Sequence, residues 1–410
     1  MTATHTGQPC KRCKVENAPY KLRNLATCRY CPSMTSVTSY HEPDCYIEHV
    51  SGKVRKNLGT MHKEIRTSAE LTPRRYLAGL SFGVSSTCLT QMLNDSAQHH
   101  AGKQSSSAFE PLIVHIDTDL AAAPAESHDT PAQRLLAKYR ARYPHISFDC
   151  VHLSKAIALR TVDWSTLLPL YKTLDTAEDG ASDVEKLRRL FDALPSVTSR
   201  ADVLRQLVRH LLIDTARARG YSVVLLGHST SALAALTLAE VANGRGFSVP
   251  GQVGDGVQTV CEYDDAGRET ARVMFPVYYP LREVLKNELV GYVDLIPVLA
   301  EMKRQGEVDG VAGRSSHSVV SHRDVSIEEV MQRYFDGVEG PYSGIVANVV
   351  RTTGKLDRVA GGAFCRLCGM TLDESGDDRW AGDLGQDSGD SAADHHKGKL
   401  CYGCRRSVSG

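Results

Sequence analysis

The hydrophobic pattern in the middle of the chain alternates between short apolar runs and longer stretches with helical spacing. The short runs predict strands at residues 76–80, 111–116, 145–153, 221–226 and 272–278. Apolar residues at helical spacing predict helices between them, including 131–142, 201–219, 230–243 and 281–295. Strands that alternate with helices predict an α/β fold with a mainly parallel sheet, helices on both of its faces, and ligands at the carboxyl ends of the strands.

The remaining stretches are polar and show neither the short apolar runs of strands nor the apolar spacing of helices. We expect an irregular insertion over 154–199, a Gly- and Asp-rich loop over 245–269 and a charged segment over 301–324, after which helical spacing resumes at 326–335. Changes in composition divide the chain into four parts: a cysteine knuckle at 1–50, a basic helical connector at 51–70, an α/β domain at 71–350 and a second knuckle at 360–410 with an acidic, disordered insertion at 373–394.

Overall charge leaves the class of partner open. The chain has 410 residues with 48 basic and 48 acidic side chains, so a formal charge of zero neither favours nor excludes nucleic acid. No apolar run approaches the ~20 residues that a membrane helix needs. The first residues lack the apolar core of a signal peptide. We therefore expect a cytoplasmic protein that has no membrane partner.

Nine of the twelve cysteines lie near the two ends of the chain. In a reducing compartment, paired C-x-x-C spacing indicates metal binding rather than disulfides. Each set predicts a structural zinc site, because four thiolates leave no open coordination position for catalysis. The candidate ligands are Cys10, Cys13, Cys28 and either Cys31 or Cys45 in the first set, and Cys365, Cys368, Cys401 and Cys404 in the second.

A cluster of basic residues follows the first knuckle, on a predicted helix at 46–68. Its members are Lys53, Arg55, Lys56, Lys63 and Arg66. Such a cluster is typical of a solvated helix face. Beside a zinc knuckle it also suits contact with the phosphate backbone of a nucleic acid. The sequence alone leaves both interpretations open.

The turn after the first predicted strand reads Ser81-Phe82-Gly83-Val84-Ser85-Ser86. Gly- and Ser-rich turns between a parallel strand and a helix bind phosphate through free backbone amides and the helix dipole. This turn resembles the phosphate loop of the ATP-pyrophosphatase (PP-loop) superfamily, which reads Ser-Gly-Gly-x-Asp-Ser. The resemblance implies nucleotide contacts by Ser81, Gly83, Ser85 and Ser86. Because Ser85 replaces the acid that supports magnesium, we expect weak ATP binding at most and a large loss of rate.

The turn after the fourth predicted strand begins with Gly227-His228. Taken alone, this pair is typical of an ordinary strand–helix turn with a histidine cap. Catalytic members of the superfamily that this chain resembles have the sequence Gly-His-Asn-x-Asp-Asp-x-x-Glu-Thr at this position. This chain keeps the Gly-His pair, but its acids are replaced by Ser231, Ala232 and Ala235. The cysteines outside the knuckles, Cys88, Cys150 and Cys261, form no C-x-x-C pair, so we predict no catalytic residue.

Several features together resemble the cytoplasmic tRNA 2-thiolation protein 2 family over almost the whole chain. They are the two knuckles, the degenerate loop, the stretch 210–246 and the ending LCYGCRR. The resemblance implies a non-catalytic subunit that binds tRNA and scaffolds a heterodimer with the catalytic paralogue, cytoplasmic tRNA 2-thiolation protein 1. That complex converts wobble uridine 34 to 2-thiouridine (mcm5s2U) in lysine, glutamine and glutamate tRNAs, with sulfur from a thiocarboxylated ubiquitin-like carrier.

The chain departs from the family pattern in two places. Phe82 and Val84 stand where family members write Gly and Pro. The family closes its first knuckle with Cys-Arg-Asp-Cys and an aromatic residue, a pattern that makes Cys45 the ligand if 30–43 is an insertion. Two other functions stay open: a self-sufficient ATP-dependent tRNA sulfurtransferase, and a zinc-dependent RNA- or protein-binding module.

Overall fold

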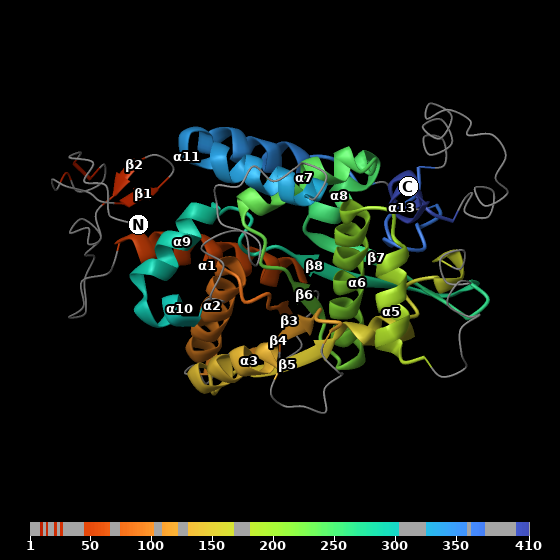
Figure 1. Ribbon diagram of the computed structural model, residues 1–410. Helices are drawn as coiled ribbons and strands as arrows, with labels where there is room; N and C mark the ends of the chain where they lie inside the picture. Colours follow the sequence, from red (N-terminus) through yellow and green to blue (C-terminus); the bar gives the residue numbers. More distant parts are fainter. Residues whose placement is uncertain are drawn as a thin grey trace.

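A six-stranded sheet forms the centre of the molecule (Figure 1). The computed structural model describes residues 9–10, 14, 20–22, 25–27, 45–65, 74–101, 109–121, 130–167, 181–302, 325–358, 362–373 and 399–409. The strand order is β5-β4-β3-β6-β8-β7, in which only β7 runs antiparallel to its neighbour. The strands are β3 (Arg74–Gly79), β4 (Phe109–Asp117), β5 (Ser147–His152), β6 (Val223–Leu225), β7 (Gly256–Tyr263) and β8 (Glu269–Tyr278).

Side chains of the central strands alternate between two hydrophobic cores, one on each face of the sheet. In β3, Tyr76 and Ala78 face one core, whereas Leu77 faces the other. The first core is completed by α1 (Cys45–Ile65), α2 (Val84–Ala101), α3 (Pro131–Arg142), α9 (Lys286–Leu295) and α10 (Pro297–Met302). The second is completed by α5 (Asp183–Ala193), α6 (Val197–Ala218), α7 (Thr230–Ala242), α8 (Val249–Val253), α11 (Ile327–Thr353) and α13 (Tyr402–Ser409). The predicted α/β class, with helices on both faces, is therefore confirmed.

Short elements complete the described part of the chain. They are the hairpin of β1 (Tyr20–Leu22) and β2 (Leu25–Thr27) and the 3-10 turns η2 (Leu153–Ala158), η3 (Trp164–Leu167) and η4 (Gly246–Ser248). No helix in the described part is both long and apolar enough to cross a membrane. Most of the predicted acidic insertion at 373–394 lies outside the described residues.

Two stretches expected to be irregular contain regular elements, so those predictions are wrong in part. The insertion at 154–199 holds α5 and the first turn of α6, which begins at Val197 where the Ser196 hydroxyl accepts from Ser199 N. The supposed loop at 245–269 holds β7, the edge strand. Polar residues on the solvent side of an edge strand dilute its apolar signal, which explains this second miss.

The helix expected at 326–335 is also longer than predicted. It continues as α11 to Thr353, although Pro341 lies inside it and Tyr342 has non-helical backbone angles. The buried residues Val346 and Val350 lie beyond this kink, and α11 lies along α7 (Figure 1). Packing against α7 therefore stabilises α11 on both sides of Pro341, although proline usually ends a helix.

Candidate functional site

The degenerate phosphate loop lies between β3 and α2, at the carboxyl edge of the sheet. Hydroxyl groups of the loop accept hydrogen bonds from its own backbone amides. Ser81 N donates to Ser86 Oγ over 3.2 Å, and Gly83 N donates to Ser81 Oγ over 3.3 Å. Ser86 Oγ in turn donates to Gly83 O over 3.1 Å. Two amides of the kind that hold a pyrophosphate therefore already have partners within the loop.

Phe82 is the most unusual residue of this loop. Its φ of 63° lies in the left-handed region that favours glycine, which is the residue at this position of the superfamily loop. The side chain is only 1% exposed. Its ring centroid lies 4.3 Å from that of His115 on β4 and 5.5 Å from that of Tyr139 on α3. The loop thus uses a backbone conformation that favours glycine to insert a ring into the core.

The structure brings the two degenerate motifs together. A Cβ atom on Gly227 would lie 3.3 Å from Ser86 Cα and 3.4 Å from Ser86 N. Only a glycine fits this contact without displacing the neighbouring backbone. The predicted loop residues Ser81, Gly83, Ser85 and Ser86 and the pair Gly227 and His228 therefore belong to one region, as expected for two turns at the carboxyl ends of adjacent parallel strands.

His228 points into the protein. Its ring packs edge-on against Tyr279 with 5.4 Å between centroids, and its Nδ1 atom is enclosed without a hydrogen-bond partner among the described residues. Burial lowers the pKa of His228 to about 4, and the nearby Arg205 and Arg209 add to this effect. The imidazole is therefore neutral at pH 7 and packs as an uncharged ring.

A buried carboxylate from another element contacts Ser231, one of the residues that replace acids in the second motif. Ser231 Oγ donates a hydrogen bond to Glu339, which lies on α11 and is 2% exposed. The same carboxylate accepts from Asn287 N over 2.6 Å, at the first turn of α9. Burial raises the pKa of Glu339 despite these two donors. Sequence reasoning missed Glu339 because the predicted helix ended at residue 335.

The C-terminal cysteines form the one group of metal-binding side chains among the described residues. The Sγ atoms of Cys365, Cys368, Cys401 and Cys404 lie within 4.8 Å of one another, and all four residues are buried. Zinc binds thiolate at about 2.3 Å, which places two sulfurs of a tetrahedron about 3.8 Å apart. Cys368 Sγ and Cys401 Sγ are 3.9 Å apart. The geometry therefore fits a single tetrahedral metal ion, whereas the four cysteines of a [4Fe–4S] cluster bind four separate irons and lie farther apart.

This cysteine cluster is fastened to the α/β domain by buried polar contacts. Arg245 is completely buried, and its Nη1 atom lies 3.8 Å from Cys404 Sγ and 2.9 Å from Asp202 Oδ2. His210 on α6 lies 2.9 Å from Leu367 O through its Nε2 atom. The four cysteines also belong to the core that α6 and α7 share. The second knuckle is thus part of the domain's interior, and Arg245, in a stretch expected to be a loop, was missed.

The N-terminal set of cysteines is described only in part. Cys10 is buried, and its carbonyl accepts from Lys14 N over 2.8 Å. Cys13, Cys28 and Cys31 lie outside the described residues, as does the side chain of Cys45, at which α1 begins. The choice between Cys31 and Cys45 stays open.

The remaining cysteines have no features of catalytic thiols. Such thiols are accessible and have a lowered pKa. Burial raises the pKa of Cys150 to about 11, with Asp117 and Asp149 adding to the shift, and burial also raises the pKa of Cys261. Cys88 is fully buried, and its Sγ lies 3.7 Å from Leu289 O. These environments suit packed side chains.

The basic residues of α1 fall into separate environments. Lys53 is 15% exposed and forms an ion pair of 3.0 Å with Glu288, so it connects α1 to α9. Arg55 is exposed and forms an ion pair with Glu48. Lys56 and Lys63 are exposed, and Arg66 lies outside the described residues. The tRNA contact predicted for this helix stays a prediction, and Lys56 and Lys63 are its exposed described members without an ion pair.

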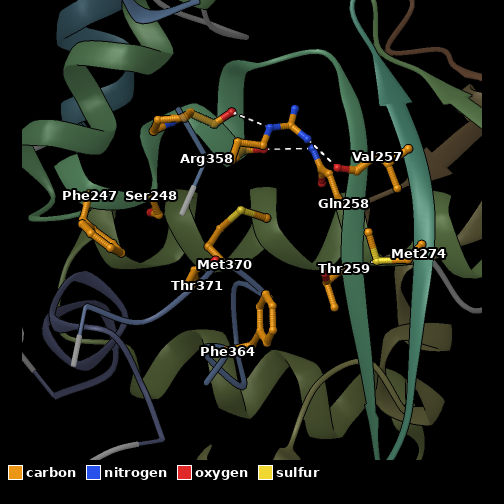
Figure 2. Close-up of a pocket in the computed structure, with 13 residues that line it drawn as sticks. Phe247, Ser248, Val257, Gln258, Thr259, Met274, Arg358, Phe364, Met370 and Thr371 are labelled. Atoms are coloured by element: carbon orange, nitrogen blue, oxygen red, sulfur yellow. Dashed lines mark hydrogen bonds between the residues drawn. The ribbon is translucent and has the colours of Figure 1, made fainter. Parts of the chain in front are cut away.

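A groove of about 380 Å³ lies away from both motifs, between the β7 edge of the sheet and the second knuckle. Figure 2 shows Phe247, Met274, Phe364 and Met370 around it. Arg358 lines one side, where it donates to Val257 O over 2.6 Å and to Pro250 O over 3.2 Å (Figure 2). The guanidinium of Arg358 therefore connects this part of the chain to the β7 edge through backbone carbonyls.

Two solved structures resemble this chain at low identity. The U34-tRNA thiolase NcsA from Methanococcus maripaludis with its [4Fe-4S] cluster is 14% identical, with 83% of this chain and 95% of that chain covered at a TM-score of 0.46. The NH3-dependent NAD synthetase from Campylobacter jejuni is 10% identical, with coverage of 76% and 99% at a TM-score of 0.34. The fold assignment stands on the strand order itself.

Sequence comparisons are more specific. The family model described as cytoplasmic tRNA 2-thiolation protein 2 matches residues 326–386, which include all of α11. Relatives with that name are 32% identical in Phaeosphaeria nodorum, with 98% of this chain and 95% of the relative covered, and 32% identical in Pyrenophora tritici-repentis, with the same coverage. A third, from Sclerotinia sclerotiorum, is 30% identical over 83% of this chain and 80% of the relative. Because these likenesses span nearly the whole length, the chain belongs to the cytoplasmic tRNA 2-thiolation protein 2 family.

Proposed function

We propose that this chain is the non-catalytic subunit of a cytoplasmic complex that converts wobble uridine 34 of lysine, glutamine and glutamate tRNAs to 2-thiouridine. In this proposal it binds tRNA and scaffolds the catalytic paralogue, cytoplasmic tRNA 2-thiolation protein 1. The paralogue carries out adenylation and sulfur transfer, with sulfur from a thiocarboxylated ubiquitin-like carrier.

The observation that carries this proposal is the state of the inherited nucleotide site. PP-loop chemistry needs free amides for pyrophosphate and an acid for magnesium. Here loop hydroxyls occupy the Ser81 and Gly83 amides, and Ser85 stands at the acid's position. In the second motif, Ser231 donates to the carboxylate of Glu339. Both changes serve packing, which supports a structural role for the loop and a catalytic site on another chain.

Metal binding has a structural role in this proposal. The C-terminal cysteines fit one zinc ion, which would hold the knuckle against α6, and we assign a second zinc to the N-terminal set. Neither ion has an open coordination position for a substrate when four cysteines bind it. ATP binding is at most weak.

Reconstitution tests the division of labour. The purified chain is mixed with ATP, tRNA and the sulfur carrier, either alone or together with the paralogue, and thiouridine is measured by mass spectrometry of tRNA digests. We expect product only when the paralogue is present. Thiouridine formed by this chain alone would instead establish the self-sufficient sulfurtransferase.

The remaining alternative is a zinc-dependent RNA- or protein-binding module that acts outside thiolation. A co-purification experiment from cells separates it from the subunit. Recovery of the paralogue in stoichiometric amounts supports the proposal, and its absence favours the separate binding module.

A further inference from the structure

The helix α3 has an unusual charge pattern for a protein with no net charge. It carries Arg134, Lys138, Arg140 and Arg142, and no aspartate or glutamate lies between Thr130 and Phe148. Arg134, Lys138 and Arg142 follow one another at intervals of four, so they lie on one face of the helix about 6 Å apart along its axis. All three are exposed. We propose that this face of α3 is a binding surface for the phosphate backbone of RNA.

Three of the cations of α3, namely Lys138, Arg140 and Arg142, have no carboxylate partner in the described part of the chain. Among the described residues, no carboxylate oxygen lies within 4.0 Å of the charged groups of Lys138, Arg140 or Arg142. Several exposed cations elsewhere do have such partners, as in the pairs Arg55–Glu48, Arg188–Glu185, Arg219–Asp149, Arg272–Glu269 and Arg333–Glu329. Lys138 and Arg142, which share one face of α3, therefore retain their field for an external anion.

The nature of this surface favours a polyanion over a protein partner. Ala137 and Ala141 lie between the cations, and the exposed large apolar side chains of the described chain all lie on other elements. Protein interfaces concentrate aromatic and apolar anchors at their centre and are depleted in lysine. Contacts to nucleic-acid phosphates come mainly from arginine and lysine.

The surface is rigidly held. Thr130 caps the helix by accepting from Gln133 N over 3.2 Å, and Pro131 begins it. Tyr139, on the buried side, is within 2.6 Å of the Thr87 hydroxyl through its own hydroxyl, and its ring contacts Phe82. The altered phosphate loop thereby supports the basic helix. A fixed arrangement of cations loses little conformational entropy on binding.

The basic surface continues toward α1 across α2. Asp95 on α2 lies close enough to both Arg55 and Arg142 for these cations to lower its pKa, although burial is the stronger influence and raises it. Arg55 and Arg142 thus both act on the charge of this carboxylate of α2, and Figure 1 shows α2 between α1 and α3. RNA lying along α3 would therefore also approach the basic residues of α1.

This inference rests on the proposed function, which supplies tRNA as the RNA. Binding of a fluorescent lysine tRNA transcript is measured by anisotropy over a series of salt concentrations, with the full chain alone and with the paralogue. We expect Lys138→Glu/Arg142→Glu to weaken binding at least tenfold, and Lys138→Gln/Arg142→Gln to reduce the slope of log affinity against log salt by roughly 1.5. Lys186→Glu, a charge reversal on α5 across the sheet, should bind like the wild type.

The outcomes separate the two proposals. Binding and a salt slope equal to the wild type in both double variants would overturn the RNA surface and leave the proposed function standing. Loss of the paralogue with unchanged tRNA binding would show that α3 is a protein interface, which also overturns it. If the wild-type chain binds no tRNA under either condition, both proposals fail. Thermal unfolding at an unchanged temperature verifies that the variants are folded.

Discussion

The hydroxyl of Ser231 donates a hydrogen bond to the carboxylate of Glu339, which comes from α11, more than a hundred positions later in the chain. The superfamily motif that this stretch resembles has an aspartate at the position of Ser231. A carboxylate there would face the carboxylate of Glu339 in a buried space. The packing of α11 on α7 therefore suits a hydroxyl at position 231 better than a second carboxylate.

Restoring the acid should destabilise the protein. We expect Ser231→Asp to lower the free energy of unfolding by about 3 kcal/mol at pH 7, because it places two like charges in contact away from water. Ser231→Ala removes only a hydrogen bond and should cost about 1 kcal/mol. Urea unfolding followed by circular dichroism measures both.

A suppressor makes this test specific. Glu339→Gln added to Ser231→Asp should recover most of the lost stability, since a carboxamide can donate to the new carboxylate. Equal stability of Ser231→Asp and Ser231→Ala would show that Glu339 does not oppose an acid here.

Because the backbone at Phe82 is strained, a glycine variant should be more stable than an alanine variant, which is the reverse of the usual order of stability. Both Phe82→Ala and Phe82→Gly lose the buried ring, at about 3 kcal/mol. Glycine relieves the left-handed conformation, whereas alanine retains it, so we expect Phe82→Gly to be the more stable variant by about 1 kcal/mol. Chemical denaturation compares the two, and a more stable Phe82→Ala would contradict the left-handed assignment.

Metal content distinguishes the two knuckles. We expect about two zinc ions per chain and the loss of one in Cys404→Ser. The unfolding temperature should fall as well, because this cluster belongs to the core of α6 and α7. Cobalt exchanged into the site should show sulfur-to-cobalt charge-transfer absorption, which Cys404→Ser weakens.

A second buried cysteine provides the control for this experiment. Cys261 lies in β7, outside the four-cysteine group. Cys261→Ser should keep both metal ions and the cobalt absorption. Unchanged metal content in Cys404→Ser would refute the C-terminal site.

The sequence predicted features that depend on local signals or on fixed topology. The bounds of α3 agree with the predicted 131–142 because Thr130 caps the helix and Pro131 suits its first turn. The approach of Gly227 to Ser86 follows from the rule that parallel strands end at one edge. The four C-terminal cysteines converge as their paired spacing indicated.

Features that depend on distant partners could not be predicted in this way. Nothing near Phe82 in the sequence indicates that its ring packs between His115 and Tyr139. The helix predicted at 326–335 ended before the part of α11 that supplies Glu339, and only packing against α7 shows that the helix continues. Arg245 stands in a Gly- and Asp-rich stretch, and only the folded chain brings it to Cys404. In each case tertiary packing overrides local preference.

The buried imidazole of His228 should make stability depend on pH. Its pKa is about 4 in the folded protein and about 6.5 when exposed, so between these values the unfolded chain binds more protons. The contribution of His228 is therefore complete above pH 6.5 and is lost as the pH falls toward 4. Arg205 and Arg209 act in the same direction, and the ring of Tyr279 covers the imidazole.

A variant without this titration isolates the effect. Between pH 7 and pH 5 we expect the wild type to lose about 2 kcal/mol more stability than His228→Gln. His62, whose pKa burial also lowers to about 4, contributes equally to both proteins and cancels in the difference. The free energy of unfolding in urea at the two pH values gives the comparison. Parallel losses in the two proteins would mean that His228 is accessible to protons in the folded state, and the interpretation of this inherited histidine as a packed, neutral ring would be wrong.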